Sequence, residues 1–313
     1  MSIIYQSQSM QRLLERAKRF AKSSAAVLIT GESGTGKELL AREVHESSSR
    51  STSPYLQVNC AALSEQLIES ELFGHVAGAF TGATQARVGR LEAVQQGTLF
   101  LDEIGELPST TQGKFLRVLE EREYQRVGSN DTMHVDGRIV AATNRVLEEE
   151  VREGKFRKDL LHRINVLCLE IPPLRDRRED IPALVTYFLN RFQCEGEARV
   201  ERVTSSVMRQ LCEYGWPGNI RQLRNTILKS CVLAASEEIN EVEFPTEVEA
   251  ASIDAELPSS FLKLPLEEIE RQVILMRITH SGGNKAAAAE TLGVTSRTLR
   301  NKIDRYRKLG YVA

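Results

Sequence analysis

The segment Gly31-Glu32-Ser33-Gly34-Thr35-Gly36-Lys37-Glu38 has the residue types and spacing of a loop that binds phosphate. Its glycines allow consecutive backbone N–H groups to converge on phosphate oxygens, and Lys37 can reach the β- and γ-phosphates of a nucleotide. The generic pattern has Ser or Thr, a magnesium ligand, after the lysine, whereas this sequence has Glu38. We therefore predict a nucleotide site in which magnesium depends on other groups.

Paired carboxylates supply such groups at the end of Thr98-Leu99-Phe100-Leu101-Asp102-Glu103, an apolar strand of the kind found in a Walker B motif. Asp102 is expected to hold magnesium, directly or through water, and Glu103 to polarise the attacking water. Taken alone, the first motif could be a glycine-rich turn that binds nothing, and the second a solvated strand end. Together they favour an ATPase with ATP and Mg²⁺ as cofactors.

Two asparagines follow strands that are expected to neighbour the paired carboxylates. Asn144 follows the apolar run 139–143, where its amide could orient water or sense the γ-phosphate. Asn59 follows the run 55–58, within reach of Glu103. Each could instead be an asparagine that caps a strand-to-helix turn.

The elements that position these residues follow from the apolar pattern. Runs with strand character are separated by helical patterns, as in a parallel sheet flanked by helices: 27–30, 55–58, 99–101, 139–142 and 166–171. After Pro172-Pro173 the strands stop, and helical patterns follow at 180–194, 204–214 and 220–235. We predict an α/β nucleotide-binding core over residues 1–172 and a small all-α lid over residues 173–236.

Composition agrees with a globular protein of more than one domain. The chain has 313 residues, of which 41% are hydrophobic and 27% charged. No apolar run approaches the roughly 18 to 20 residues of a membrane span, so we expect a cytoplasmic protein with no membrane partner. The five cysteines are odd in number, scattered and without a Cys-x-x-Cys pair, which favours structural roles over disulfides or zinc.

The net charge of −2 conceals two opposed segments. Residues 236–256 contain eight acidic and no basic residues, so we interpret residues 237–260 as a solvated acidic linker. Residues 281–313 carry a local charge of +5 from seven basic and two acidic residues. The basic end is therefore where DNA could bind.

A helix-turn-helix is predicted within the last domain, residues 261–313. An alanine-rich helix over 285–292 ends at Gly293, and Ser296 can cap a second helix that runs to about Arg307. The side chains suited to phosphate and base-edge contacts in a major groove are Lys285, Ser296, Arg297, Arg300, Asn301 and Lys302. The alternative is a three-helix bundle with a solvated basic face.

Together these motifs resemble the AAA+ activators of sigma-54 RNA polymerase (bacterial enhancer-binding proteins), over nearly the whole chain. In that family the phosphate loop itself reads Gly-Glu-Ser-Gly-Thr-Gly-Lys-Glu, and an inserted loop carries the hexapeptide found here as Gly78-Ala79-Phe80-Thr81-Gly82-Ala83. Its small residues permit a tight, mobile turn that leaves Phe80 and Thr81 at the tip with no core to pack into. The resemblance implies that sigma-54 is their partner, and a buried Phe in an ordinary loop is the alternative.

The resemblance assigns further roles. Arg157 and Arg163 look like fingers that reach into a neighbouring subunit's site, and Arg221 resembles a lid residue that senses the nucleotide. Asn59 and Glu103 correspond to a pair that switches the catalytic carboxylate. Without the resemblance, the three arginines would be interpreted as surface residues.

The implied assembly is a homo-oligomer that forms dimers and then a ring, expected to be a hexamer. The helix around 266–279 resembles the dimerisation helix of a Fis-type DNA-binding domain. Two departures from the family stand out: Ile4 is followed by Tyr5 instead of Gly, and we expect no receiver domain before the ATPase.

The resulting prediction is a transcriptional activator that binds enhancer DNA and uses ATP hydrolysis to convert sigma-54 RNA polymerase holoenzyme from the closed to the open promoter complex. One alternative is a DNA-binding AAA+ regulator or repressor that does not engage sigma-54. Another is a remodeller of other protein clients, such as a protease-associated unfoldase. The intact hexapeptide and Glu103 disfavour the first, and the terminal helix-turn-helix disfavours the second.

Overall fold

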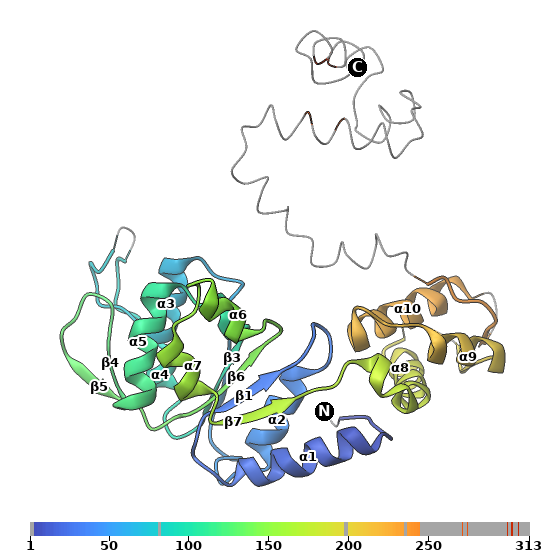
Figure 1. Cartoon of the computed structure of the whole chain (residues 1–313), viewed down its shortest axis with the longest axis horizontal. Coiled ribbons are helices and arrows are strands. Elements are labelled where there is room, and N and C mark those ends of the chain that lie inside the picture. Colours follow the sequence, from blue (N-terminus) through green and yellow to red (C-terminus); the bar gives the residue numbers. More distant parts are fainter. Residues whose placement is uncertain are drawn as a thin grey trace. The chain divides into compact units, whose positions relative to one another are not determined.

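The computed structural model describes residues 3–80, 83–196, 200–234 and 237–244, together with Arg271, Ile274, Leu299, Lys302 and Tyr306. The chain forms two compact units, Met1–Pro245 and Thr246–Ala313. The first is coloured by sequence in Figure 1. Of the residues predicted to bind DNA, only Lys302 is described, as a half-buried helical residue. Lys285, Ser296, Arg297, Arg300 and Asn301 lie outside the described residues.

A five-stranded parallel sheet forms the centre of the first unit (Figure 1). Its strands are β1 (Val27–Thr30), β2 (Tyr55–Asn59), β3 (Thr98–Asp102), β6 (Arg138–Thr143) and β7 (Leu167–Glu170), in the order β2-β3-β6-β1-β7. Each predicted strand agrees with the structure to within one residue at either end. The predicted α/β class with a parallel sheet is confirmed.

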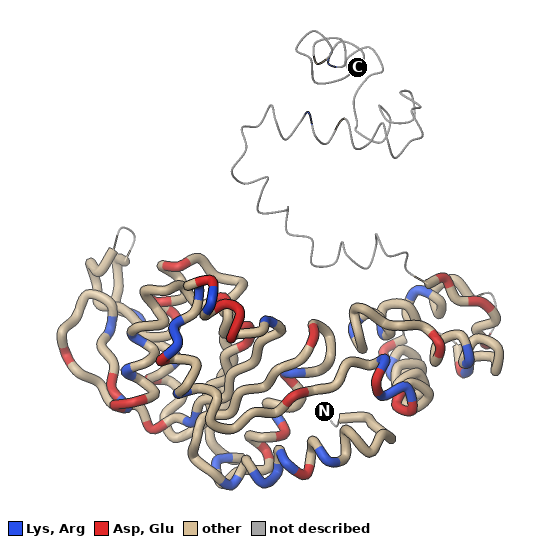
Figure 2. The backbone as a smooth tube through the Cα atoms, in the orientation of Figure 1, with Lys and Arg blue, Asp and Glu red and all other residues tan. Residues whose placement is uncertain are grey.

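Both faces of the sheet are buried, because successive strand residues alternate between two apolar clusters. Leu28 faces one cluster, whereas Val27 and Ile29 face the other. Helices α1 (Gln8–Ala21) and α2 (Lys37–Glu46) contribute to the cluster around Val27 and Ile29. The cluster around Leu28 contains residues of α3 (Glu65–Phe73), α5 (Ser109–Glu120) and α7 (Lys158–Ile164). The exposed charged residues of α1 are mostly basic, with Arg12, Arg16, Lys18 and Arg19 against Glu15, and Figure 2 shows basic positions in blue along the helix.

Short elements that the sequence analysis did not predict connect the helices and strands. They are α4 (Arg90–Ala93), the 3₁₀ turn η1 (Ile104–Glu106) and α6 (Leu147–Arg152). An antiparallel hairpin, β4 (Glu123–Gln125) with β5 (Thr132–His134), follows α5. Its strands are short and largely exposed, so they lack the apolar run on which the strand predictions relied.

The lid begins after β7 with the 3₁₀ turns η2 (Leu174–Asp176) and η3 (Arg178–Asp180). Three helices follow, close to the predicted ranges: α8 (Ile181–Cys194), α9 (Ser205–Glu213) and α10 (Asn219–Leu233). They enclose an apolar cluster around the fully buried Trp216. No helix among the described residues is both long and apolar enough to cross a membrane.

The lid extends beyond the predicted boundary at residue 236, so the expectation that a solvated linker begins at residue 237 is wrong. Strand β8 (Arg202–Val203) pairs in parallel with β9 (Glu238–Ile239), and Ile239 is 1% exposed. Phe244 stacks on Tyr214 with ring centroids 4.7 Å apart. Apolar residues placed among the acidic ones supply enough burial to hold this segment against the lid.

Candidate active site and contact loop

The glycine-rich loop joins β1 to the N-terminus of α2. Gly34 and Gly36 have φ angles of 76° and 102°, a left-handed region that is costly for residues with a Cβ. Thr35 Oγ1 donates a hydrogen bond to the Glu32 carbonyl (2.8 Å), and Lys37 Nζ donates to the Gly31 carbonyl (3.0 Å). These bonds fold the loop into a cradle at a helix N-terminus, where backbone N–H groups favour an anion.

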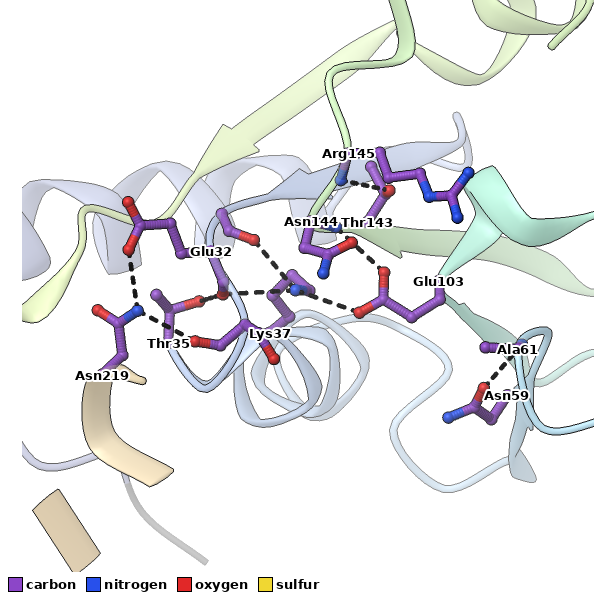
Figure 3. A network of polar contacts seen from close by, with 12 residues as sticks. Glu32, Thr35, Lys37, Asn59, Ala61, Glu103, Thr143, Asn144, Arg145 and Asn219 are labelled. Carbon is purple, nitrogen blue, oxygen red and sulfur yellow. Dashed lines mark hydrogen bonds and ion pairs between the residues drawn. The ribbon is translucent and has the colours of Figure 1, made fainter. Parts of the chain in front are cut away.

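Glu103 leaves β3 in a left-handed conformation, with φ 52° and ψ 54°. This backbone is rare for a residue other than glycine and costs on the order of 1–3 kcal/mol. It turns the carboxylate toward Lys37 Nζ, 3.5 Å away, and toward the Asn144 backbone N–H, 3.1 Å away (Figure 3). The strained residue thus brings the predicted catalytic carboxylate to the predicted phosphate-binding lysine.

Asp102 precedes Glu103 in an environment that disfavours two negative charges. Burial and the neighbouring Glu103 carboxylate raise the pKa of Asp102, while Lys37 opposes the shift. A group whose charged form is disfavoured in this way gains from a nearby cation. The pair therefore has the electrostatics expected of a site that takes up a metal ion together with an anionic nucleotide.

The sheet order explains the positions of the two asparagines. Strand β6 lies beside β3, and the residue after β6, Asn144, meets Glu103 through its backbone N–H. Strand β2 lies on the other side of β3, with Asn59 in register with Asp102. The Asn59 side chain accepts a hydrogen bond from the Ala61 backbone N–H (2.9 Å; Figure 3). No hydrogen bond among those described joins Asn59 to Glu103, so the predicted pairing of these two residues stays a prediction.

The lid contacts the phosphate loop directly. Arg221 Nη1 donates to Ser33 Oγ (2.8 Å), and the Ile220 backbone N–H donates to the Gly34 carbonyl (3.0 Å). A cavity of about 220 Å³ brings the predicted groups together. Its lining comprises Ser33, Gly34, Gly36, Lys37, Glu38, Leu39, Asp102, Glu103 and Arg221.

A second, mainly apolar cavity of about 460 Å³ lies next to the first, because Gly36, Glu38 and Arg221 line both. Its wall includes Ile4 from the N-terminal segment and Phe188 from α8. Asp180 holds that segment in place, since its Oδ1 accepts hydrogen bonds from the backbone N–H groups of Gln6 and Ser7, both at 2.6 Å. The size and chemistry suit a flat heteroaromatic base.

The hexapeptide loop lies between α3 and α4 and closes on itself. The Gly78 backbone N–H donates to the Ala83 carbonyl (2.8 Å), and the Ala83 N–H donates to the Phe80 carbonyl (3.0 Å). The Phe80 ring is half-buried and packs edge-on against His75, with centroids 5.0 Å apart. The expectation that Phe80 has nothing to pack into is therefore wrong in this conformation. Thr81 and Gly82 lie outside the described residues.

His75, which the sequence analysis did not single out, anchors the base of this loop. Its Nε2 lies 3.0 Å from the Gln85 carbonyl and its Nδ1 2.7 Å from Ser70 Oγ. Because a carbonyl only accepts, Nε2 carries a proton. Residue 75 also forms β-bridges with Arg87, at the far end of the loop, and with Val127, which is distant in sequence. Only the fold shows these contacts, so no local pattern could have identified His75.

Comparison with protein families covers most of the chain. The sigma-54 interaction domain matches residues 3–170, the AAA+ ATPase lid domain residues 175–260, and the Fis family of bacterial regulatory proteins residues 265–306. The chain belongs to the sigma-54 interaction domain family. It is an AAA+ ATPase and an ATP-dependent activator of sigma-54 transcription with a Fis-type DNA-binding domain, as the resemblance predicted.

Individual relatives match nearly the whole chain. The transcriptional regulatory protein ZraR of Salmonella typhimurium strain LT2 is 49% identical over 303 residues, which are 97% of this chain and 68% of ZraR. The regulatory protein AtoC of Escherichia coli K12 is 43% identical, with 97% of this chain and 67% of AtoC covered. The crystal structure of NtrX from Brucella abortus in complex with ADP has a TM-score of 0.71 at 34% identity, covering 97% of this chain and 68% of NtrX.

In this activator, the two arginines expected to act as fingers pair with carboxylates of their own subunit. Arg157 donates to both oxygens of Asp159, at 3.0 and 2.7 Å, and Arg163 Nε donates to Glu120 at 2.7 Å. Both side chains are at least half exposed. Among the described hydrogen bonds and ion pairs, neither arginine contacts the phosphate loop, Asp102 or Glu103.

Three lid residues that the sequence analysis missed do contact the phosphate loop. Arg175 forms a two-bond ion pair with Glu32, Arg177 donates to the Thr35 carbonyl (3.0 Å), and Asn219 bonds to both Glu32 and Ser33. The sequence carried one usable indication. Asn219 follows Pro217-Gly218 at a helix start, where an asparagine commonly adopts an unusual backbone.

Proposed function

We propose that the cavity lined by Lys37, Asp102, Glu103 and Arg221 is the site of ATP hydrolysis that drives sigma-54 holoenzyme from the closed to the open promoter complex. One observation carries this proposal. Segments far apart in sequence deliver a phosphate-binding lysine, a pair of carboxylates and a lid arginine to one cavity of about 220 Å³. This combination suits the binding and cleavage of a triphosphate.

The nucleotide spans the two adjoining cavities. Its phosphates occupy the glycine cradle, where the backbone N–H groups and Lys37 bind them. Its base enters the apolar cavity beside Ile4 and Phe188. The crystal structures of NtrX from Brucella abortus in complex with ADP and with ATP support nucleotide binding by this fold.

Magnesium fits the donor set of the site. No group of three or more His, Cys, Asp or Glu residues that could hold a metal exists among the described residues. Mg²⁺ in nucleotide enzymes commonly uses one or two carboxylates, with phosphate oxygens and waters as its other ligands. Asp102, whose pKa is raised by burial and by Glu103, is the residue that would hold it. Bound there, the ion would neutralise charge on the phosphate oxygens of the nucleotide.

Glu103 acts as the group that orients and deprotonates the attacking water. In this structure its carboxylate is shared between Lys37 and the Asn144 backbone N–H. When phosphate engages Lys37, the carboxylate loses that partner and can accept a proton from water. Asn144, which follows β6, and Asn59, the last residue of β2, lie on either side of β3 and adjust its position.

Hydrolysis requires a neighbouring subunit. The exposed Arg157 and Arg163 exchange Asp159 and Glu120 for the phosphates of the next protomer's nucleotide. An arginine supplied in this way can accelerate phosphoryl transfer by roughly 10³ to 10⁵. Dimers held on enhancer DNA by Lys285, Ser296, Arg297, Arg300, Asn301 and Lys302 assemble into the ring, which is a hexamer.

The output of the cycle is the loop Gly78 to Ala83. Phe80 leaves His75 and, with Thr81, contacts sigma-54 in the nucleotide state that raises the loop. A loop whose described hydrogen bonds lie within residues 76–83 can change shape without disturbing the core. The half-buried position of Phe80 against His75 thus corresponds to the state in which the loop is not raised and does not contact sigma-54.

A Thr81→Ala variant tests this proposal. Formation of open complexes on a sigma-54 promoter is followed beside ATP turnover, with Thr132→Ala, an exposed threonine on the hairpin, as the matched control. We expect Thr81→Ala to abolish open complexes at a turnover within about twofold of wild type, because contact and hydrolysis use different residues. Open complexes formed by Thr81→Ala at the wild-type rate would refute the assignment of the loop.

A further inference from the structure

Asn219 occupies a conformation that the local sequence alone does not require. It begins α10 with φ 51°, in the left-handed region, and Trp216 three residues earlier has φ 48°. The Asn219 residue is 0% exposed. A buried polar residue held in a disfavoured backbone conformation indicates that its surroundings fix it there.

The bonds of Asn219 use its entire side-chain amide. Its Oδ1 accepts from the Leu174 backbone N–H (2.8 Å), at the point where the chain enters the lid. Its Nδ2 donates to Glu32 Oε2 and to the Ser33 carbonyl, both at 3.0 Å (Figure 3). One side chain thus joins the start of the lid, the start of α10 and the phosphate loop.

Glu32 is held from a second direction. Arg175 donates to its two oxygens, at 2.9 and 2.6 Å. The Arg175 guanidinium, with the Asn219 amide adding to its effect, holds the pKa of the Glu32 carboxyl below its ordinary value despite partial burial. The second residue of the phosphate loop is therefore a charged acceptor for two donors of the lid.

This arrangement places the lid close against the loop. A Cβ at Gly34 would lie 2.5 Å from the Gly218 carbonyl oxygen, so the two backbones leave no room between them. Arg221, two residues after Asn219, donates to Ser33 Oγ. Any shift of Ser33 or Gly34 must therefore move the start of α10 or break these bonds.

We propose that Asn219 is a positioning residue that couples the phosphate loop to the lid through Glu32 and Ser33, and so places Arg221 against the bound nucleotide. The proposal rests on the nucleotide site described under Proposed function. Asparagine suits this position because it supplies two donors and one acceptor and tolerates the left-handed backbone. Aspartate has the same shape but would set carboxylate oxygens against the Glu32 carboxylate and the Ser33 carbonyl.

Asn219→Asp is the test, and the chain offers a matched control in Asn225→Asp. Asn225 lies in the same helix but is exposed and bonds to Arg224. Trp216 is the only tryptophan of the chain and is fully buried three residues before Asn219, so its fluorescence reports on this turn during an ADP titration. We expect Asn219→Asp to weaken ADP binding at least tenfold, which corresponds to about 1.4 kcal/mol, and Asn225→Asp to match wild type.

A double-mutant cycle separates coupling from damage to the fold. In Glu32→Gln with Asn219→Asp, the glutamine amide nitrogen can donate to the new carboxylate, while the remaining side-chain oxygen can still accept from Arg175. We expect the double variant to recover at least threefold of the ADP affinity lost in Asn219→Asp, with the Trp216 emission returning toward wild type. A misfolded Asn219→Asp protein would not be rescued by a second substitution in a distant segment.

The possible outcomes are distinct. Equal ADP affinity and equal emission in wild type and Asn219→Asp would overturn the coupling role, and so would additive effects in the cycle. A wild-type protein that binds ADP but does not hydrolyse ATP would contradict the proposed function while leaving the ADP comparison intact.

Discussion

Two glycine-rich loops of this chain, the phosphate loop at 31–38 and the contact loop at 78–83, are built from similar residues but are held in different ways. The phosphate loop receives hydrogen bonds from the lid through Arg177, Asn219, Ile220 and Arg221. Lys37 spans it from within. Its conformation is therefore tied to another part of the molecule.

The contact loop is held mainly at its base. Its described hydrogen bonds join residues 76–83 to one another, and Phe80 rests on His75. Gly128 approaches Ala79 from the side, so that a Cβ there would lie 2.8 Å from the Ala79 Cβ. Both loops owe their tight turns to small residues, but the contacts around them differ: those of the phosphate loop reach the lid, and those of the contact loop stay near its base.

The substitution Glu103→Gln should give the largest effect of the three. It should lower ATP turnover and leave the contact loop unchanged. The glutamine keeps an acceptor for the Asn144 backbone N–H but cannot take a proton from water. We expect ATP turnover to fall by roughly 10²- to 10⁴-fold, measured as phosphate release, with ADP binding within about threefold of wild type. Glu121→Gln, an exposed glutamate paired with Arg117, is the matched control. Turnover retained in Glu103→Gln would remove Glu103 from the reaction.

The strands of the phosphate side were predicted well, because they are continuous apolar runs. Local motifs singled out Lys37, Asp102 and Glu103, which line one cavity, and their roles in catalysis stay predictions. The sheet order accounts for the position of Asn144. Asn219 escaped prediction because its partner Glu32 is 187 residues away. Contacts of that range depend on how the lid meets the core, which neither propensity nor spacing encodes.

The contact side and the end of the lid were predicted less well. Phe80 was expected to lack a packing partner, yet His75 provides one through a base assembled with Arg87 and Val127. The segment after residue 236 was interpreted from its charge, although Ile239 is buried. In both cases the composition was described correctly. The packing of a few side chains, which composition does not show, decides the local structure.

Gly34→Ala should have the next largest effect, because it strains the phosphate loop and collides with the lid. The new Cβ would lie 2.5 Å from the Gly218 carbonyl oxygen, at a φ of 76°. We expect ADP affinity, followed by Trp216 fluorescence, to fall by about tenfold or more as the lid is displaced. Gly154→Ala provides the control, since Gly154 has φ 73° and nothing within 4 Å of its Cβ position. An unchanged ADP affinity in Gly34→Ala would show that contact between the lid and the phosphate loop does not affect nucleotide binding.

The substitution Gly78→Ala should have the smallest effect of the three. It tests the contact loop in place of the phosphate loop. Gly78 has φ 80°, and nothing lies within 4 Å of its Cβ position, so the substitution adds backbone strain without a collision. That strain is worth about 1–2 kcal/mol in a left-handed residue. We expect the free energy of unfolding, measured by denaturant titration, to fall by about 1 kcal/mol, as in Gly154→Ala, with ATP turnover unchanged. A much larger loss of unfolding free energy in Gly78→Ala than in Gly154→Ala would mean that the contact loop packs against further residues. The two loops would then differ only in how strongly their surroundings hold them.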